Sequence, residues 1–223
     1  MKKIVFALLT AVLTACSGGN ELVILHLNDT HSHIDPERSG EYKGRGGVIE
    51  HAVFIDSVRN ASGASNVLLL HGGDFSQGTS YFTEMNGEME ISVLNSTGYD
   101  AVCLGNHEFD KKMTGLGDML ALSKVPVVAS NYDFSNTTLA KYVVPSKILN
   151  AGKIKVGFIG LNVRLLNLVN KTACEGVEWQ DAVNVADKYA EELRAQGADI
   201  VIALSHLGYE ADSDAYYYDK GLA

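Results

Sequence analysis

The stretch that decides the fold is Gly105-Asn106-His107-Glu108-Phe109-Asp110, which follows directly on the apolar run 101–104. A short, continuously apolar run of this kind predicts a buried strand. Amide, imidazole and carboxylate groups, which bind divalent metal ions, follow it at once. We therefore expect this strand to carry chemistry at its carboxyl end.

The same arrangement occurs three more times along the chain. The three motifs, with the runs that they follow, are Asp29-Thr30-His31 after 22–27, Gly73-Asp74 after 67–70, and Ser205-His206 after 200–204. In α/β proteins, ligands collect outside the carboxyl ends of the strands. We therefore expect the four motifs to meet at one edge of a sheet, where their residue types predict a two-metal hydrolase site.

Strand-like and helix-like segments alternate along the chain. The apolar runs predict strands at 22–27, 67–70, 101–104, 125–130, 154–161 and 200–204. Helical spacing of apolar residues predicts helices at 45–60, 89–95 and 180–196. Such alternation indicates an α/β fold, and runs that are apolar throughout indicate strands covered on both faces. We predict one layered domain, with central mostly parallel β-sheets flanked by helices.

The composition predicts one acidic domain. The chain has 223 residues, of which 46% are hydrophobic, and a formal net charge of −9. This length suffices for one hydrophobic core. The negative charge argues against nucleic acid as a partner, because nucleic-acid binding needs basic patches. A phosphorylated small molecule is compatible with the charge, because bound metal ions reverse the local field at a site.

The first sixteen residues predict a targeting segment. Lys2 and Lys3 precede the apolar stretch 4–13, which has the length of a signal-peptide core and is too short to span a bilayer. Leu13-Thr14-Ala15-Cys16 resembles a bacterial lipobox, in which Cys16 is lipidated and becomes the mature N-terminus. The alternative is an ordinary signal peptide with an incidental cysteine.

The lipobox interpretation divides the chain into three parts. Residues 1–16 are a lipoprotein signal peptide, residues 17–21 a tether, and residues 22–223 the catalytic domain. We expect an exported bacterial lipoprotein, in the periplasm or at the outer membrane, that is held to a membrane by its lipid.

Five residues in the four motifs are candidate metal ligands. They are Asp29, His31, Asp74, Asn106 and His206. Asp29 and His31 are two residues apart, so in an extended segment both side chains point to the same side and can coordinate one ion. Asp74 follows two glycines that allow a tight turn, and its two carboxylate oxygens can bridge two ions. For each position taken singly, the alternative is an ordinary turn or cap residue.

Four other histidines fall into two pairs. His26 lies inside a predicted strand and His51 beside the apolar face of a predicted helix, so we expect structural roles for both. His33 and His71 lie close to motif residues and are candidates for orienting the ligands.

Taken together, the motifs resemble the calcineurin-like metallophosphoesterase superfamily. The pattern is D-x-H, then G-G-D-x-x-x-G, then G-N-H-E, then a strand that ends in S-H. Within this superfamily, the amino-acid sequence around the motifs is similar to that of the 5′-nucleotidase branch. The similar stretches are His26-Leu27-Asn28-Asp29-Thr30-His31-Ser32-His33, Gly73-Asp74-Phe75-Ser76-Gln77-Gly78-Thr79, Gly105-Asn106-His107-Glu108-Phe109-Asp110 and Ala129-Ser130-Asn131. The resemblance extends over essentially the whole segment that follows the predicted signal peptide.

The resemblance implies a role for each motif residue. Asp29 and His31 would hold the first of two divalent metal ions, Asp74 would bridge both ions, and Asn106 and His206 would serve the second. The predicted catalytic residues are Asn106, His107 and Asp110. Besides the ligand Asn106, His107 would contact the substrate phosphate, and Asp110 would orient His107. The ligand types suit Zn²⁺, Mn²⁺ or Fe. The implied reaction is hydrolysis of phosphate monoesters, above all nucleoside 5′-monophosphates, by a metal-activated water.

The sequence also departs from the resemblance. The family takes its last two ligands from a later Gly-His-Ser/Thr-His/Gln motif, which does not occur here, so we expect the C-terminal part of the catalytic domain to be missing. The family's second domain, which binds the nucleoside, is expected to be missing or separate, and no substrate-binding residue is assigned. A non-catalytic lipoprotein binding module on the same phosphoesterase scaffold, with a depleted metal site, is the alternative function. Among enzymes, a nucleotide-sugar hydrolase and a 2′,3′-cyclic nucleotide phosphodiesterase remain open.

Overall fold

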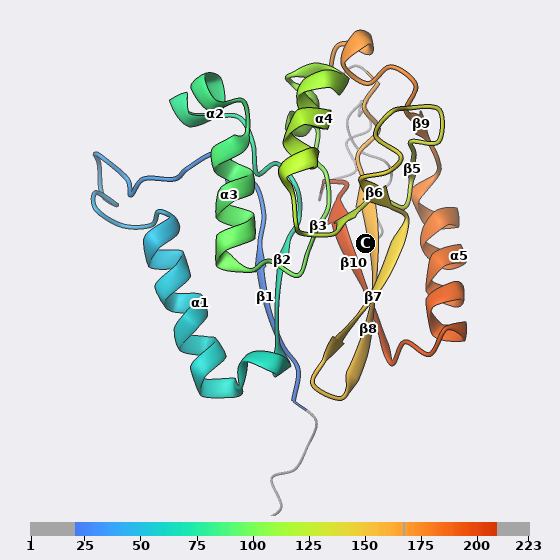
Figure 1. Cartoon of the computed structure of the whole chain (residues 1–223), viewed down its shortest axis with the longest axis horizontal. Helices are drawn as coiled ribbons and strands as arrows, with labels where there is room; N and C mark the ends of the chain where they lie inside the picture. The colour runs from blue at the N-terminus through green and yellow to red at the C-terminus, as the bar shows by residue number, and fades with distance from the viewer. Residues whose placement is uncertain (1–20, 167, 209–223) are drawn as a thin grey trace, which may run out of the picture.

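Two β-sheets face each other in the computed structural model, which describes residues 21–166 and 168–208 (Figure 1). The helices are α1 (Val48–Ser62), α2 (Ser80–Met85), α3 (Glu88–Thr97), α4 (Lys112–Leu122) and α5 (Ala182–Ala195), with short 3-10 turns η1 (Ala64–Asn66), η2 (His107–Phe109) and η3 (Lys171–Ala173). The strands are β1 (Val23–Leu27), β2 (Val67–His71), β3 (Ala101–Val102), β4 (Val127–Val128), β5 (Tyr132–Asp133), β6 (Val143–Val144), β7 (Ser146–Ala151), β8 (Ile154–Asn162), β9 (Glu178–Trp179) and β10 (Ile200–His206).

Part of the predicted organisation lies outside the described residues. This applies to the signal peptide 1–16 with Cys16, and to residues 17–20 of the tether. Within the described residues, no helix is both long enough and apolar enough to cross a membrane.

The sheets are mostly parallel, as predicted. The first sheet has the strand order β1-β2-β3-β4-β6, and all of its neighbours pair in parallel. In the second sheet, with the order β10-β8-β7, β8 pairs in parallel with β10 and antiparallel with β7. Strands β5 and β9 form a separate small antiparallel pair. The parallel pairing brings the carboxyl ends of the long strands to one edge.

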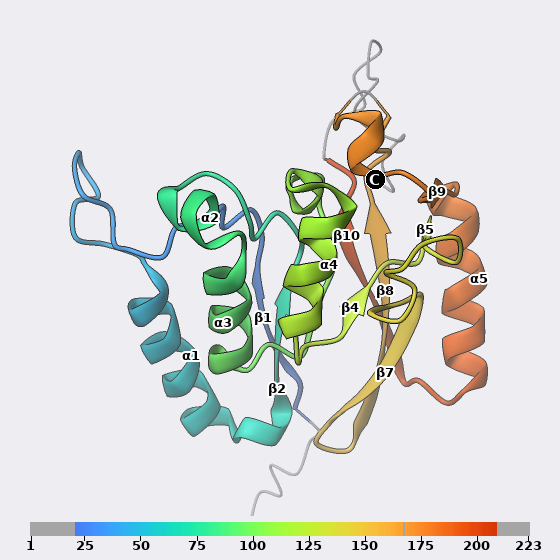
Figure 2. The same cartoon turned by 45° about the horizontal axis from the view of Figure 1, so that its top comes forward.

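Helices cover the outer faces of the two sheets, so the molecule has four layers. Helices α1, α3 and α4 lie along the first sheet and α5 along the second (Figure 2). Side chains from both sheets, including Leu70, Phe158 and Leu204, form the core between them. A second cluster joins α3 and α4 to the first sheet, and a third joins α5 to β8. The predicted α/β layering is thus confirmed.

Asparagine side chains join the two sheets near the carboxyl ends of the strands. Asn131, just beyond β4, is fully buried and bonds both backbone groups of Asn162 at the end of β8. Its Oδ1 accepts from the Asn162 amide at 2.7 Å, and its Nδ2 donates to the Asn162 carbonyl at 2.8 Å. The Asn162 side chain in turn donates to the carbonyl of Leu104, beyond β3. These bonds fix the edge on which the site is built.

Two predicted strands are less buried than their composition indicated. The run 22–27 alternates in the structure, because β1 is an edge strand and no described segment covers Ile24 and His26. Strand β10 is likewise an edge strand of its sheet among the described residues, and Ile200 is exposed. The prediction of strands covered on both faces holds for β2, whose five residues are all buried.

Helix α4 and strand β7 were not predicted from the sequence. Helix α4 contains Gly115 and Gly117, and glycine is a poor helix former, so its helical pattern is weak. The helix is held by burial of Leu116, Met119 and Leu120 against the first sheet. Strand β7 lies at the edge of its sheet and mixes polar and apolar residues without a clean alternation.

Candidate active site

The loops after β1 and β2 are joined backbone to backbone. Leu27 pairs with His71 at the ends of the two strands. Beyond them, the Asp29 amide donates to the Gly73 carbonyl and the His31 amide to the Asp74 carbonyl, both at 3.1 Å. The loops therefore run side by side and present their polar side chains together.

Asp29 and His31 converge by a different route from the one predicted. Both have left-handed backbone conformations, with φ of 51° and 44°, so the segment is a turn and not an extended strand. His31 Nε2 still lies 3.6 Å from Asp29 Oδ1. Non-glycine residues rarely adopt this conformation, and Asp74 shares it with φ of 50°. Such strained positions concentrate at functional sites.

Asp74 lies at the centre of the cluster. It is 3% exposed, and its Oδ2 lies 3.2 Å from His206 Nε2 and 3.9 Å from His31 Nε2. Two groups of side chains have ligand atoms within 4.8 Å of one another: Asp29, Asp74 and His206, and His31, Asp74 and His107. Asp74 belongs to both groups, which is the position that a bridging carboxylate requires.

The electrostatics of the cluster follow from the contact between Asp74 and His206. Burial raises the pKa of Asp74, but the His206 hydrogen bond and charge and the His107 amide outweigh it, so the pKa is lowered. Burial lowers the pKa of His206, but the hydrogen bond and charge of Asp74, with the charges of Glu108 and Asp29, raise it to about 9. The other ring nitrogen, Nδ1, donates to the Gly72 carbonyl at 2.9 Å. His206 is thus fixed in orientation from the second sheet.

The Gly105–Asp110 segment supplies the other side of the cluster. Asn106 is the N-cap residue of the 3-10 turn η2, and its side chain makes no capping hydrogen bond, so it is free to act as a ligand. His107 Nδ1 lies 2.9 Å from Asp110 Oδ2, which is the orienting contact that was predicted. The His107 and His31 rings lie 5.2 Å apart, centroid to centroid. The structure therefore brings Asp29, His31, Asp74, His107 and His206 to one place, with Asp110 against His107 and Asn106 next to His107 in the chain.

Glu108 is a site residue that sequence reasoning missed. Its side chain is fully buried and accepts four hydrogen bonds: from the amides of Asp74, Ser76 and Gly105 and from the Ser76 hydroxyl. The bonds from Asp74 and Ser76 are 3.0–3.1 Å long, and the one from Gly105 is 2.6 Å. Burial and the charge of Asp74 raise the pKa of Glu108. The carboxylate ties the loop that carries Asp74 to the loop that carries His107.

Two glycines let these loops approach closely. A Cβ on Gly105 would overlap the Asp74 carboxylate. A Cβ on Gly73, where φ is +102°, would lie 2.7 Å from the Gly105 nitrogen and 3.0 Å from His206 Nδ1. Neither position has space for a side chain.

Among the other histidines, His71 has the most clearly defined role. It is 1% exposed, accepts from the Gly73 amide at 3.1 Å through Nδ1, and donates from Nε2 to Thr30 Oγ1 at 3.0 Å. Burial lowers its pKa to about 3, so it is neutral and holds the two loops together, as a ligand-orienting residue would. His33 contacts only the nearby Thr30 carbonyl, at 3.2 Å. His26 and His51 are exposed.

Comparison with known proteins places this geometry in a family. Residues 22–222 match the profile of the family described as Calcineurin-like phosphoesterase. The chain is 36% identical over 221 residues to a snake venom 5′-nucleotidase of Gloydius brevicauda, covering 95% of this chain and 37% of the relative. It is 32% identical over 209 residues to a probable 5′-nucleotidase of Treponema pallidum, covering 91% of this chain and 35% of the relative.

Solved structures give the same result. The NAD nucleotidase of Haemophilus influenzae matches with a TM-score of 0.71 and 32% identity, over 84% of this chain and 34% of that one. A 5′-nucleotidase precursor from Thermus thermophilus matches with a TM-score of 0.73 and 34% identity, over 84% of this chain and 37% of that one. The chain spans well under half the length of these relatives.

Proposed function

Since the chain belongs to the calcineurin-like phosphoesterase family, we propose that it carries the catalytic site of a two-metal hydrolase of nucleoside 5′-monophosphates. The observation that carries this proposal is the position of Asp74, which belongs to both groups of candidate ligands. Similarity to 5′-nucleotidases supports the substrate class.

The donor set fits two divalent metal ions. Asp29 and His31, whose Oδ1 and Nε2 atoms lie 3.6 Å apart, would hold one ion, and Asn106 and His206 the other, with Asp74 shared by both. When bound, such ions supply acidified water and withdraw charge from the phosphate. Carboxylate, imidazole and amide ligands suit Zn²⁺, Mn²⁺ or Fe, because none of them is a thiolate.

His107 is the residue that we assign to the substrate. Its Nδ1 faces Asp110, which fixes the orientation of the ring and leaves Nε2 to donate to a phosphate oxygen. A donor aimed at a phosphoryl oxygen stabilises the charge that builds up as the ester bond breaks. Because His107 also lies in one of the two ligand groups, its role has to be separated from that of a ligand by experiment.

Two variants separate these roles. Asp74→Asn should lose both metal content and hydrolysis of adenosine 5′-monophosphate, because the shared ligand is weakened. His107→Ala should retain both ions and lose turnover, by about a hundredfold or more for a group that acts in proton transfer or charge stabilisation. Metal content is measured by elemental analysis and turnover by phosphate release from the full-length polypeptide. Loss of one ion in His107→Ala would make His107 a ligand instead. A wild-type protein that neither holds two ions nor releases phosphate would favour the non-catalytic binding module, whose metal site is depleted.

Dinucleotides are a second substrate candidate. The chain is 32% identical over 198 residues to an NAD 5′-nucleotidase of Haemophilus influenzae, which also has a similar structure. The assay should therefore compare adenosine 5′-monophosphate with NAD at equal concentration. Phosphate release from the monophosphate alone would assign a simple 5′-nucleotidase, whereas cleavage of NAD to mononucleotides would add a pyrophosphatase activity.

We also propose that the protein is exported and anchored through a lipid on Cys16. The support is the sequence of residues 1–16, in which a basic start and an apolar core precede the lipobox-like segment. In a bacterial expression host, the wild type should incorporate a labelled fatty acid and sediment with membranes. Cys16→Ser should do neither, and equal labelling of the two would contradict the assignment.

A further inference from the structure

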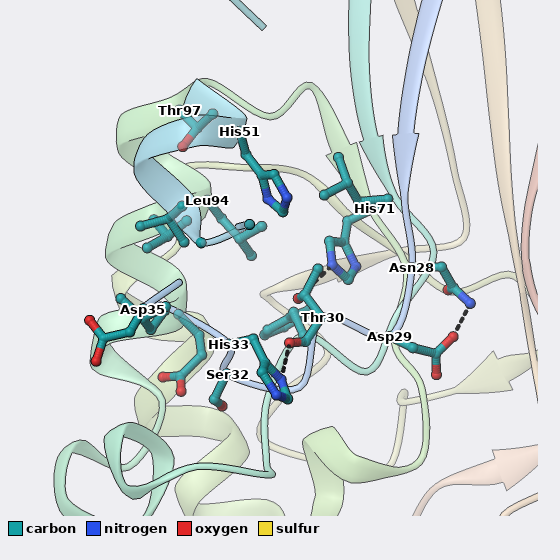
Figure 3. Close-up of a pocket in the computed structure, with 18 of the residues that line it drawn as sticks. Asn28, Asp29, Thr30, Ser32, His33, Asp35, His51, His71, Leu94 and Thr97 are labelled. Carbon is teal, nitrogen blue, oxygen red and sulfur yellow. Dashed lines mark hydrogen bonds between the residues drawn. The ribbon is translucent and has the colours of Figure 1, made fainter. Parts of the chain in front are cut away.

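A cavity separate from the metal-ligand cluster lies between α1, α3 and the loop that follows β1. Its volume is about 410 Å³. Figure 3 shows His51, Leu94 and Thr97 around it, while the carboxylate of Asp29 points away from these three residues. The 28–30 segment therefore forms a wall of the cavity, and the metal-ligand groups of Asp29 face elsewhere.

Glu90 is the distinctive residue of this cavity. It lies in the first turn of α3, and the residues Glu90, Val93, Leu94 and Thr97 turn one helical face to the cavity. Its side chain is only 3% exposed, yet neither carboxylate oxygen has a hydrogen-bond partner among the described residues. A buried carboxylate without a partner is costly, because it has lost its hydration without compensation.

The residues around the cavity favour a positively charged ligand. Besides Glu90, the lining contains the carboxylates of Glu37 and of Asp35, which is paired with Arg38 outside the lining, against the single guanidinium of Arg45. His71 adds no charge, because burial lowers its pKa to about 3. Two further histidines in the lining, His33 and His51, are exposed. A phosphate or another anion would therefore be repelled.

The same residues exclude a bare metal ion and favour an organic one. Ca²⁺ and Mg²⁺ need six or more oxygen ligands, whereas the surroundings of Glu90 include the apolar side chains of Leu27, Phe75, Val93 and Leu94. We propose that this cavity is a second ligand site, which binds a small organic cation through an ammonium or amidinium group on the Glu90 carboxylate. The apolar body of the ligand packs against these side chains.

Three small probes of one shape test the proposal. Benzamidine carries the cation, benzamide keeps the N–H donors without the charge, and benzoate reverses the charge. Benzamidine should bind in isothermal titration, and benzamide and benzoate should bind at least about tenfold more weakly, because a charge-assisted pair is about that much stronger. Equal affinity for benzamidine and benzamide would overturn the charge assignment.

Matched variants locate the site. Glu90→Gln should weaken benzamidine binding at least about tenfold, whereas Glu88→Gln, an exposed glutamate in the same helical turn, should leave it unchanged. Val93→Phe should also abolish binding by filling the cavity without altering its charge. Circular dichroism and thermal melting confirm that each variant is folded. Unaltered binding in both Glu90→Gln and Val93→Phe would overturn the proposal.

Competition separates this site from the metal-ligand cluster. The titration is repeated with saturating Mn²⁺, which on the proposed function binds the carboxylates of Asp29 and Asp74. Benzamidine should bind with the same affinity. If Mn²⁺ displaces it, benzamidine binds to the metal ligands and the inference fails, while the proposed hydrolase site remains intact. Failure of hydrolysis, conversely, would leave the result of this titration unaffected.

Discussion

His206 Nε2 lies 3.2 Å from Asp74 Oδ2, although the two residues come from different sheets. His206 ends β10 of the second sheet, and Asp74 follows β2 of the first. The other nitrogen of the same imidazole binds the Gly72 carbonyl, so a single side chain links the second sheet to the loop that carries the proposed bridging ligand. The site is thus formed only when the two sheets have packed together.

This contact predicts how the stability of the metal-free protein depends on pH. The pKa of His206 is raised from 6.5 to about 9 in the folded chain, so folding binds its proton more tightly. The resulting stabilisation is fully present below pH 6.5 and is lost as the pH rises through about 9. We expect the free energy of unfolding, measured by urea denaturation with a chelator, to fall over this interval.

Two controls belong to this measurement. His206→Gln should show a flatter pH dependence, because the titrating group is gone. Saturating Mn²⁺ should flatten the dependence of the wild type as well, since a metal ion takes the place of the proton. Identical pH profiles for the wild type and His206→Gln without metal would contradict the assignment.

Replacement of Glu108 by glutamine should destabilise the fold. One carboxylate oxygen becomes an amide nitrogen, which cannot accept from the amides of Asp74, Ser76 or Gly105. Each buried donor left without an acceptor costs about 1–3 kcal/mol, so we expect a loss of about 2–4 kcal/mol in chemical denaturation. The exposed Glu84→Gln serves as the control and should change stability by less than about 0.5 kcal/mol. A loss that small in Glu108→Gln would disprove the role of the four bonds.

Gly105→Ala should impair metal binding more than it impairs folding. The added Cβ would overlap Asp74 Oδ1, so the carboxylate must move away from its position between the two ligand groups. We expect less bound metal and a drop in phosphate release, both measured on the purified variant. Gly117→Ala is the matched control, because its Cβ would meet only the flexible end of Leu139 at 2.9 Å, far along the chain from these ligands. Full metal occupancy in Gly105→Ala would show that Asp74 has room to adjust.

Asp110→Asn should lower turnover and leave metal content unchanged. The carboxylate lies 2.9 Å from His107 Nδ1 and fixes the ring, whereas an amide holds it less firmly and without charge. Loss of such an orienting partner costs about tenfold to a hundredfold in related sites. The exposed Asp118→Asn, on α4, controls for a general change of charge. Steady-state kinetics should show the effect in kcat, and an effect confined to KM would assign Asp110 to substrate binding.

The sequence predicted the site residues better than it predicted the turns and hydrogen bonds that hold them in place. Asp29, Asp74, Asn106 and His206 each follow a local apolar run, so their place at strand ends could be read from neighbouring residues alone. The left-handed turn at Asp29 could not, because it depends on hydrogen bonds to the loop after β2. The roles of His107 and Asp110 were predicted from the similarity of the motif sequences to those of a known family.

Long-range burial explains what was missed. Glu108 stood beside His107 in the decisive motif, but its acceptor role depends on amides more than thirty residues away. Glu90 lies within a predicted helix, and its burial arises only where α3 meets the loop after β1. The partial exposure of β1 was also missed, because composition does not reveal which strand lies at the edge of a sheet.

The Glu108 carboxylate holds the turns through their backbone amides and is not one of the proposed ligands. Scaffold and chemistry are therefore carried by different side chains of the same short motif. Evolution can in consequence exchange individual ligands, and with them the preferred metal or the reaction, while Glu108 and the glycines preserve the shape of the turns. A lineage that lost hydrolysis altogether would be expected to keep Glu108 long after His107 had changed.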